Sequence, residues 1–126
     1  MITHVTAIEG YESPPPRKGI LKYLVDPEKT GAESFVMGLS SIEPGTRTAP
    51  AQHPQEEAYY VLRRRGRAAV GDEVKEVGPG TVIFIPSNAR HQIESLGPDP
   101  LEYVWAMAPQ PGRLVPKREW KQIPPS

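Results

Sequence analysis

Short stretches of alternating or continuous apolar residues dominate the chain from about Gly31 onward. In residues 34–39, Phe35, Met37 and Leu39 alternate with other residues and fall on one face of an extended chain. Glycine and proline separate such stretches at a spacing of roughly 8–12 residues, which is typical of an antiparallel sandwich or barrel. We therefore predict an all-β protein with strands over residues 34–39, 59–62, 68–70, 74–77, 81–85, 91–94 and 101–107.

Three further segments are less regular. Residues 54–58 begin with proline and two acids, as a helix does, but the two tyrosines and the valine that follow favour a strand. Residues 19–27 predict an additional strand, which would either cap the edge of its own barrel or pair with a second copy of the chain. A short helix over residues 117–121 is a weaker prediction.

The composition narrows the possible functions. The 126 residues fit one domain, and the 16 prolines favour extended arms and turns. Because Lys+Arg and Asp+Glu both number 15, no net charge draws the chain to nucleic acid or to a membrane. The absence of cysteine excludes disulfides and thiol catalysis. No apolar run is long enough to span a bilayer and no signal peptide is visible, so we expect a cytoplasmic protein.

Two glycine-anchored blocks, residues 44–57 and 78–91, hold two of the three histidines. His53, Glu57 and His91 are a ligand set for one transition metal, with Fe, Mn, Ni, Zn or Cu all suitable. On a continuous strand His53 and Glu57 would lie about 13 Å apart. We therefore expect a turn or bulge around Pro54, Gln55 and Glu56 to bring the carboxylate of Glu57 back towards His53. Two imidazoles and one acid leave coordination positions open, which favours substrate or water binding over a structural metal.

The first block contains Gly45, Ala51, His53 and Glu57, followed by Arg64. It resembles the first motif of the small single-domain cupins: Gly, five residues, His-x-His, three or four residues, Glu, six residues, Gly. Ala51 stands at the first histidine of that motif and Arg64 at its closing glycine. The resemblance therefore implies four metal ligands, of which this chain retains three. Water is expected at the fourth position, since Gln52 or Gln55 would supply only a neutral amide.

The second block contains Gly80, Pro86, Asn88 and His91, followed by Ser95. It resembles the second cupin motif: Gly, five residues, Pro-x-Gly, two residues, His, three residues, Asn. Asn88 replaces a glycine, and asparagine also tolerates a left-handed backbone. Arg64 tolerates it less well, so we expect that hairpin to turn at Gly66 instead.

The resemblance covers about residues 35–107 and implies an antiparallel double-stranded β-helix, or jelly-roll barrel, with an extra N-terminal strand. We expect an N-terminal arm and strand over 1–30, the cupin barrel over 31–110 and a proline-rich tail over 111–126. Cupins include dioxygenases, isomerases, lyases and decarboxylases, and they commonly pair, so the resemblance implies a homodimer and a small organic substrate with a carbonyl or carboxylate group. A ligand-binding or sensing cupin without turnover, and a metal-free relic acting through its dimer, are the alternatives.

Further candidate residues come from the strand pattern. Tyr59 and Glu57 are the candidates for assisting catalysis. Alternation could place four aromatic residues on the inward face of the barrel. We expect them to form the core in the first place and the wall of a substrate cavity in the second. These residues are Tyr59, Phe84, Tyr103 and Trp105. Arg47 lies an even number of residues before His53 and is a candidate for binding an anionic group. The arginine-rich residues 63–67 predict a solvated turn with local ion pairs, not a nucleic-acid site. His4 is expected to have no role.

Overall fold

A computed structural model describes residues 1–125; Ser126, the last residue of the expected tail, lies outside them. Within this range the chain forms mainly strands, with one short 3-10 turn at Val5–Ala7 and two short helices. The strands are β1 (Gly10–Glu12), β2 (Gly19–Val25), β3 (Val36–Ile42), β4 (Glu56–Arg63), β5 (Gly66–Val70), β6 (Glu73–Val77), β7 (Val82–Ile85), β8 (His91–Ser95), β9 (Leu101–Ala108) and β10 (Lys121–Ile123). The helices are α1 (Pro27–Thr30) and α2 (Val115–Glu119).

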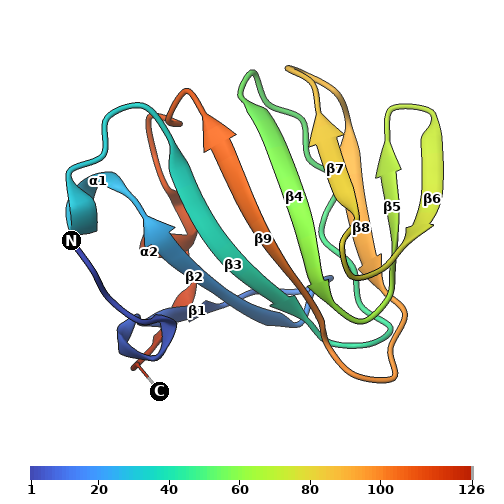
Figure 1. The fold of residues 1–126 in the computed structure, drawn as a ribbon, viewed down its shortest axis with the longest axis horizontal. Coiled ribbons are helices and arrows are strands. Elements are labelled where there is room, and N and C mark those ends of the chain that lie inside the picture. Colours follow the sequence, from blue (N-terminus) through green and yellow to red (C-terminus); the bar gives the residue numbers. More distant parts are fainter. Residues whose placement is uncertain (126) are drawn as a thin grey trace.

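The strands form two antiparallel sheets (Figure 1). The larger sheet has the order β10-β1-β2-β3-β9-β4-β7, and the smaller has the order β6-β5-β8. Apolar side chains from both sheets pack into one core, in which Ile42, Val61, Ile93 and Leu101 are fully buried. The all-β, antiparallel jelly-roll architecture predicted from the sequence is confirmed.

In strand β3, alternate residues point into the interior of the fold and away from it. Phe35, Met37 and Leu39 do share a face, but this is the less buried one. The opposite face, which includes Val36 and Gly38, points inward. Gly38 lies opposite Trp105 of β9 in the antiparallel register, and the indole occupies the space that a side chain at residue 38 would need.

The segment that begins at Pro54 is a bend followed by a strand, because β4 starts at Glu56. This confirms the strand prediction over the helical alternative. The connection from β4 to β5 corrects a second expectation. The chain turns at Arg64 itself, which adopts a left-handed φ of 69°, and not at Gly66. Asn88 has a φ of 64°, so it adopts the left-handed backbone that asparagine tolerates.

Both ends of the chain extend the larger sheet (Figure 1). The predicted extra strand, β2, pairs with β1 and β3 of its own chain. β10 pairs with β1, so the C-terminal segment returns to the N-terminal one. The predicted C-terminal helix is present, but it begins two residues earlier than expected, at Val115. No helix within residues 1–125 has the length and apolar character needed to cross a membrane.

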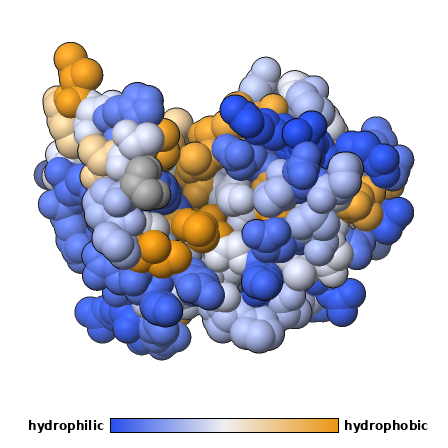
Figure 2. Space-filling view, turned by 90° about the horizontal axis from the view of Figure 1, so that it is seen from below, coloured by the Kyte–Doolittle hydropathy of each residue, from blue (hydrophilic) through white to orange (hydrophobic). Residues whose placement is uncertain are grey.

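A buried ion pair fastens α2 to the rest of the fold. Lys117 Nζ lies 2.9 Å from Asp26 Oδ2, and Asp26 is fully buried. The other oxygen of Asp26 accepts a hydrogen bond from the backbone N–H of Lys29 and so caps α1. Asp26 therefore joins the N-terminal strand region to the C-terminal helix. The outer surface is mixed, and Figure 2 shows a group of apolar side chains near the middle of one face, bordered by hydrophilic ones.

Candidate metal centre

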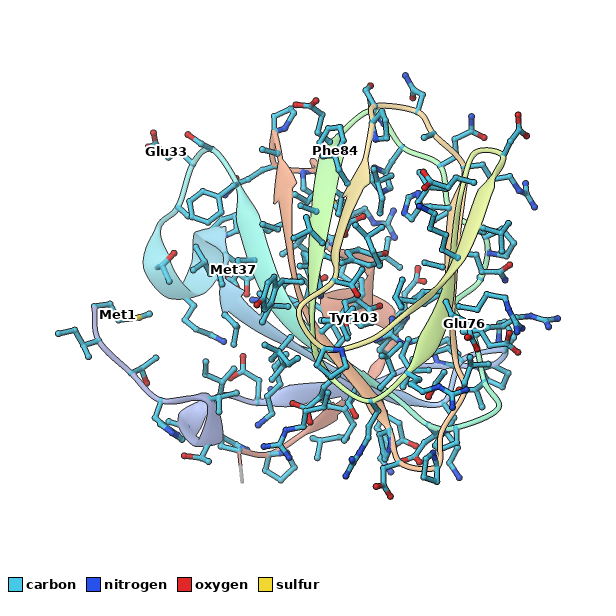
Figure 3. All side chains as sticks on the ribbon, turned by 45° about the vertical axis from the view of Figure 1, so that its right-hand side comes forward. Met1, Glu33, Met37, Glu76, Phe84 and Tyr103 are labelled. Carbon is cyan, nitrogen blue, oxygen red and sulfur yellow. The ribbon has the colours of Figure 1, made fainter. Side chains whose placement is uncertain are left out.

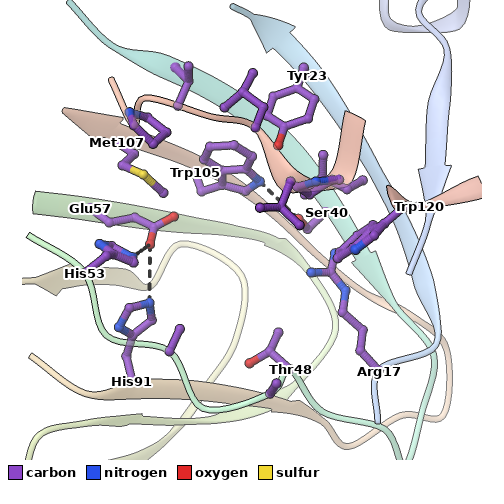
Figure 4. Close-up of a pocket in the computed structure, with 18 of the residues that line it drawn as sticks. Arg17, Tyr23, Ser40, Thr48, His53, Glu57, His91, Trp105, Met107 and Trp120 are labelled. Atoms are coloured by element: carbon purple, nitrogen blue, oxygen red, sulfur yellow. Dashed lines mark hydrogen bonds and ion pairs between the residues drawn. The ribbon is translucent and has the colours of Figure 1, made fainter. Parts of the chain in front are cut away.

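His53, Glu57 and His91 come together between the two sheets (Figure 4). His53 precedes β4, Glu57 is the second residue of β4, and His91 begins β8. Glu57 Oε1 lies 3.2 Å from His53 Nε2 and 3.4 Å from His91 Nε2. Glu57 and His91 are almost completely buried, and His53 is 22% exposed. One ligand atom from each residue lies within 4.8 Å of the other two, so the three can bind a single ion.

Local backbone structure accounts for this convergence. The chain bends at Pro54 and Gln55, between His53 and Glu57, which confirms the predicted departure from a continuous strand. The N–H of Asn88 donates a hydrogen bond to the carbonyl oxygen of His53, at 2.8 Å, and ties the turn before β8 to the loop before β4. The left-handed backbone of Asn88 allows that turn.

The hydrogen bonds of the two imidazoles decide what the cluster can bind. His53 Nδ1 lies 3.1 Å from the carbonyl oxygen of Gln55, and His91 Nδ1 lies 3.0 Å from that of Ala89. A carbonyl oxygen only accepts hydrogen bonds, so each Nδ1 carries a proton and each Nε2 faces Glu57, with a free lone pair when the ring is neutral. Two lone pairs facing a carboxylate oxygen repel one another unless a cation lies among them.

Either protons or a metal ion can supply that positive charge. Burial lowers the pKa of His91, but the hydrogen bonds to Glu57 and to the Ala89 carbonyl outweigh burial, and the pKa is raised. The carboxylate therefore favours positive charge at this point. Two imidazole nitrogens with backbone-oriented Nδ1–H groups, together with one carboxylate oxygen, are donors suited to Zn, Fe, Mn, Ni or Cu. The residues fit a divalent transition metal.

Ala51 lies beside this cluster. It exchanges two backbone hydrogen bonds with His91, both of 2.9 Å, in an isolated antiparallel bridge. Directly opposed residues of such a pair project to the same face, and Ala51 does line the cavity that contains His91. Its methyl group leaves open the side of the cluster at which the first histidine of the cupin motif would lie.

The cluster lies in a cavity of about 570 Å³, which is within the usual range for a small-molecule site. Aromatic side chains form much of its wall. Tyr59 and Tyr103 stack with ring centroids 4.5 Å apart, and the Trp105 indole N–H donates to Ser40 Oγ at 3.0 Å. Burial raises the pKa of Tyr59 well above its ordinary value, and the nearby Tyr103 and Glu57 raise it further. Tyr59 is therefore a neutral phenol, which can donate a hydrogen bond but is a poor base.

Two of the predicted binding residues lie elsewhere. In β7 the alternation buries Ile83 and Ile85, so Phe84 faces outward and is 54% exposed, unlike the interior Tyr103 (Figure 3). Arg47 is also exposed and is not part of the cavity wall. Residues 48–50 do not form a regular strand, so the even spacing between Arg47 and His53 does not give a common face.

Other cavity residues were not anticipated from the sequence. They come from the N-terminal arm and the C-terminal tail, and they include Arg17, Tyr23, Leu114 and Trp120. The sequence predicted the arm and tail only as segments flanking the barrel, because proline-rich segments carry no periodicity that distinguishes an exposed arm from one packed over a cavity. The cation–π contact between Arg17 and Trp120, with 5.3 Å from Cζ to the ring centroid, joins the two segments.

Two facing antiparallel sheets with a histidine and carboxylate cluster between them define the cupin class. A profile of the family described as "Cupin domain" matches residues 38–107, and the chain belongs to this family. Among its curated relatives is the polyketide synthase protein CurC of Streptomyces cyaneus. It is 30% identical over 118 residues, which cover 93% of this chain and 74% of that protein.

Solved structures agree with this assignment. The polyketide cyclase RemF from Streptomyces resistomycificus superposes with a TM-score of 0.78 at 25% identity, over 90% of this chain and 82% of that one. A predicted oxalate decarboxylase from Thermotoga maritima superposes with a TM-score of 0.74 over 87% of this chain and all of the other. Its 22% identity supports a common fold alone.

Proposed function

We propose that this cupin binds a divalent transition metal through His53, Glu57 and His91 and acts on a small, conjugated organic molecule with carbonyl or carboxylate groups. The observation that carries the proposal is the convergence of two Nε2 atoms on one Oε1 atom, with both Nδ1 atoms placed against backbone carbonyls. The likeness to CurC and RemF supports a polyketide-like substrate and a cyclase-type reaction.

The chain's own residues have distinct roles in this proposal. His53 and His91 supply imidazole nitrogens, and Glu57 supplies a carboxylate oxygen that can also receive a proton. A bound metal would polarise a carbonyl oxygen of the substrate. Tyr59, held neutral by burial, donates a hydrogen bond to an oxygen of the substrate. Tyr103 and Trp105 form flat apolar walls that orient conjugated rings and exclude water.

Metal binding by the purified protein tests the proposal. We expect about one equivalent of a transition metal per chain by elemental analysis, and a rise in melting temperature when metal is restored after chelation. His53→Ala and His91→Ala should each abolish most of this metal binding, because the remaining two donors are not a sufficient site.

His4→Ala is the matched control, because His4 is exposed and its side chain bonds Thr6 in the N-terminal turn, away from the cluster. It should bind metal as the wild type does. Wild-type protein that neither retains metal nor gains thermal stability from it would refute the proposal. Metal binding without turnover of β-polyketone or aromatic carbonyl compounds would favour a ligand-sensing cupin instead.

We also propose that the chain forms a homodimer through the outer face of β4 and β7. Large apolar side chains are exposed there in register, with Phe84 opposite Ala58 and Val82 opposite Tyr60. Phe35 and Ala106 extend this outer patch across β9. A contiguous apolar patch on a sheet face favours association with another protein surface, and the twofold pairing of identical faces is the commonest form of association.

A further inference from the structure

Arg17 places a positive charge in the wall of the cavity. Its Nε and Nη2 atoms are buried, and neither has a hydrogen-bond partner within residues 1–125. Buried guanidinium groups normally pair with a carboxylate, because leaving their N–H groups unsatisfied costs free energy. A buried polar group without a protein partner needs a partner from outside the chain, and a ligand is one that can supply it.

The surroundings of Arg17 hold it in place without neutralising it. Its Cζ atom lies 5.3 Å from the centroid of the Trp120 ring, so the guanidinium stacks on an apolar surface. Burial raises the pKa values of Tyr23, Tyr59 and Tyr103, and the charge of Arg17 opposes that rise at each of them. The positive field of Arg17 therefore extends through the cavity to the aromatic walls.

The cavity has two chemically different ends. In Figure 4 the cluster of His53, Glu57 and His91 lies at one side, and Arg17 with Trp120 lies at the other. Trp105 and Tyr23 lie along the wall between them, with their rings 5.8 Å apart. Flat aromatic walls between a metal-binding end and a cationic end match an elongated, planar molecule with an oxygen function at each end.

We propose that Arg17 binds the carboxylate of a planar, conjugated ligand whose far end reaches the cluster of His53, Glu57 and His91. The planar fork of the guanidinium suits a carboxylate, which accepts two parallel N–H bonds. The orientation of the ligand in this assignment rests on the proposed function, which places the metal at the other end of the cavity. The binding of the carboxylate by Arg17 does not need a metal. It gives the anion-binding role to Arg17 instead of the exposed Arg47.

Calorimetric titration with two matched probes tests the assignment. The probes are 2-naphthoate and its neutral analogue 2-naphthamide, and both are titrated into wild type, Arg17→Gln, Arg17→Lys and Arg47→Gln. We expect wild type to prefer the carboxylate by about tenfold or more, as a charge-assisted hydrogen-bonded pair implies. Arg17→Gln should lose the preference, Arg17→Lys should keep part of it, and Arg47→Gln should keep all of it.

A second arm separates Arg17 from the metal as the partner of the carboxylate. In the double variant His53→Ala/His91→Ala the preference should persist, and Arg17→Gln should retain the metal content of the wild type. A preference that disappears in the double variant and persists in Arg17→Gln would overturn the assignment while supporting the proposed metal centre. Absence of a preference in the wild type, or failure of both probes to bind, would also overturn it.

Discussion

At the scale of single residues, Ala51 decides how many protein ligands the centre offers. It is paired directly with His91 and lines the same cavity, so a longer side chain there would reach the cluster. We expect Ala51→His to raise the metal affinity at least about tenfold, since a fourth donor adds a coordinate bond without a change of fold. Competition with a chelator of known affinity measures the change.

Gln52→His is the control for this prediction. Gln52 is the next residue, is exposed, and uses its side-chain amide to bond the carbonyl of Asn88 rather than facing the cluster. It should leave the affinity unchanged. An equal rise in both variants would show that any added imidazole near the loop suffices, and would contradict the placement of Ala51.

Gly38 determines where the cavity wall lies. A methyl group at this position would overlap the ring of Trp105. We expect Gly38→Ala to lower the free energy of unfolding by about 1–3 kcal/mol, because the tightly packed interior has no room for it. Urea denaturation measures this loss. Gly112→Ala is the control, since nothing lies within 4 Å of its added methyl group; an equal loss there would contradict the packing argument.

At the scale of elements, the strands were predictable and the loops less so. Alternation and turn residues located β3 to β9 to within a few residues, because a half-buried strand imposes a period of two on its sequence. Alternation alone does not say which face is inward, and this is why Phe84 was assigned to the cavity although its neighbours Ile83 and Ile85 are the buried residues of β7.

The candidate site was also predictable only in part. His53, Glu57 and His91 could be found because their chemistry and their motif spacing are visible in the sequence. Arg17 and Trp120 could not, since they reach the cavity through long-range contacts between the two chain ends. Arg47 is the opposite case, since the sequence predicted it in the site and the structure places it outside. Its even spacing from His53 gives a common face only on a regular strand, and residues 48–50 are irregular.

The attachment of α2 depends on the pair of Lys117 and Asp26. Burial raises the pKa of Asp26, but the hydrogen bonds and charges of Lys117 and Lys29 outweigh it and hold the pKa below its ordinary value. We expect Lys117→Met to lower the free energy of unfolding at pH 7 by about 1–3 kcal/mol, because it leaves one oxygen of a fully buried carboxylate without a partner.

The sign of the pH effect follows from linkage. A carboxylate whose pKa is depressed in the folded state stabilises the protein above its unfolded pKa and loses that contribution as the pH falls through the folded pKa. The difference between wild type and Lys117→Met should therefore shrink in acid, as the pH falls below the ordinary pKa of an aspartate carboxyl. Lys121→Met, at an exposed lysine outside the ion pairs of residues 1–125, should change stability little at either pH. A difference that persists in acid would contradict the role of Asp26.

At the scale of the whole molecule, the outer patch and the cavity lie on different parts of the fold. The exposed side chains of Phe84, Val82 and Tyr60 cover the outside of the larger sheet, whereas the cavity lies between the sheets. We expect sedimentation to give a dimer for the wild type and a monomer for Phe84→Glu, because a charge at the centre of an apolar interface is costly to bury. The monomer should keep its metal.

Val74→Glu tests whether any exposed apolar position has this effect. Val74 is 59% exposed on β6, in the other sheet, so its charge should leave the dimer intact. A monomeric wild type, or a dimeric Phe84→Glu variant, would rule out this face as the interface.

We propose that one metal ion lies among the imidazoles of His53 and His91 and the carboxylate of Glu57. Anomalous diffraction from crystals of the purified protein, recorded at the absorption edge of the metal it retains, tests this most directly. We expect one strong peak, at about 2.0–2.2 Å from His53 Nε2, His91 Nε2 and a carboxylate oxygen of Glu57. A metal-loaded protein with its only peak at another position, or no peak at the cluster, would contradict it.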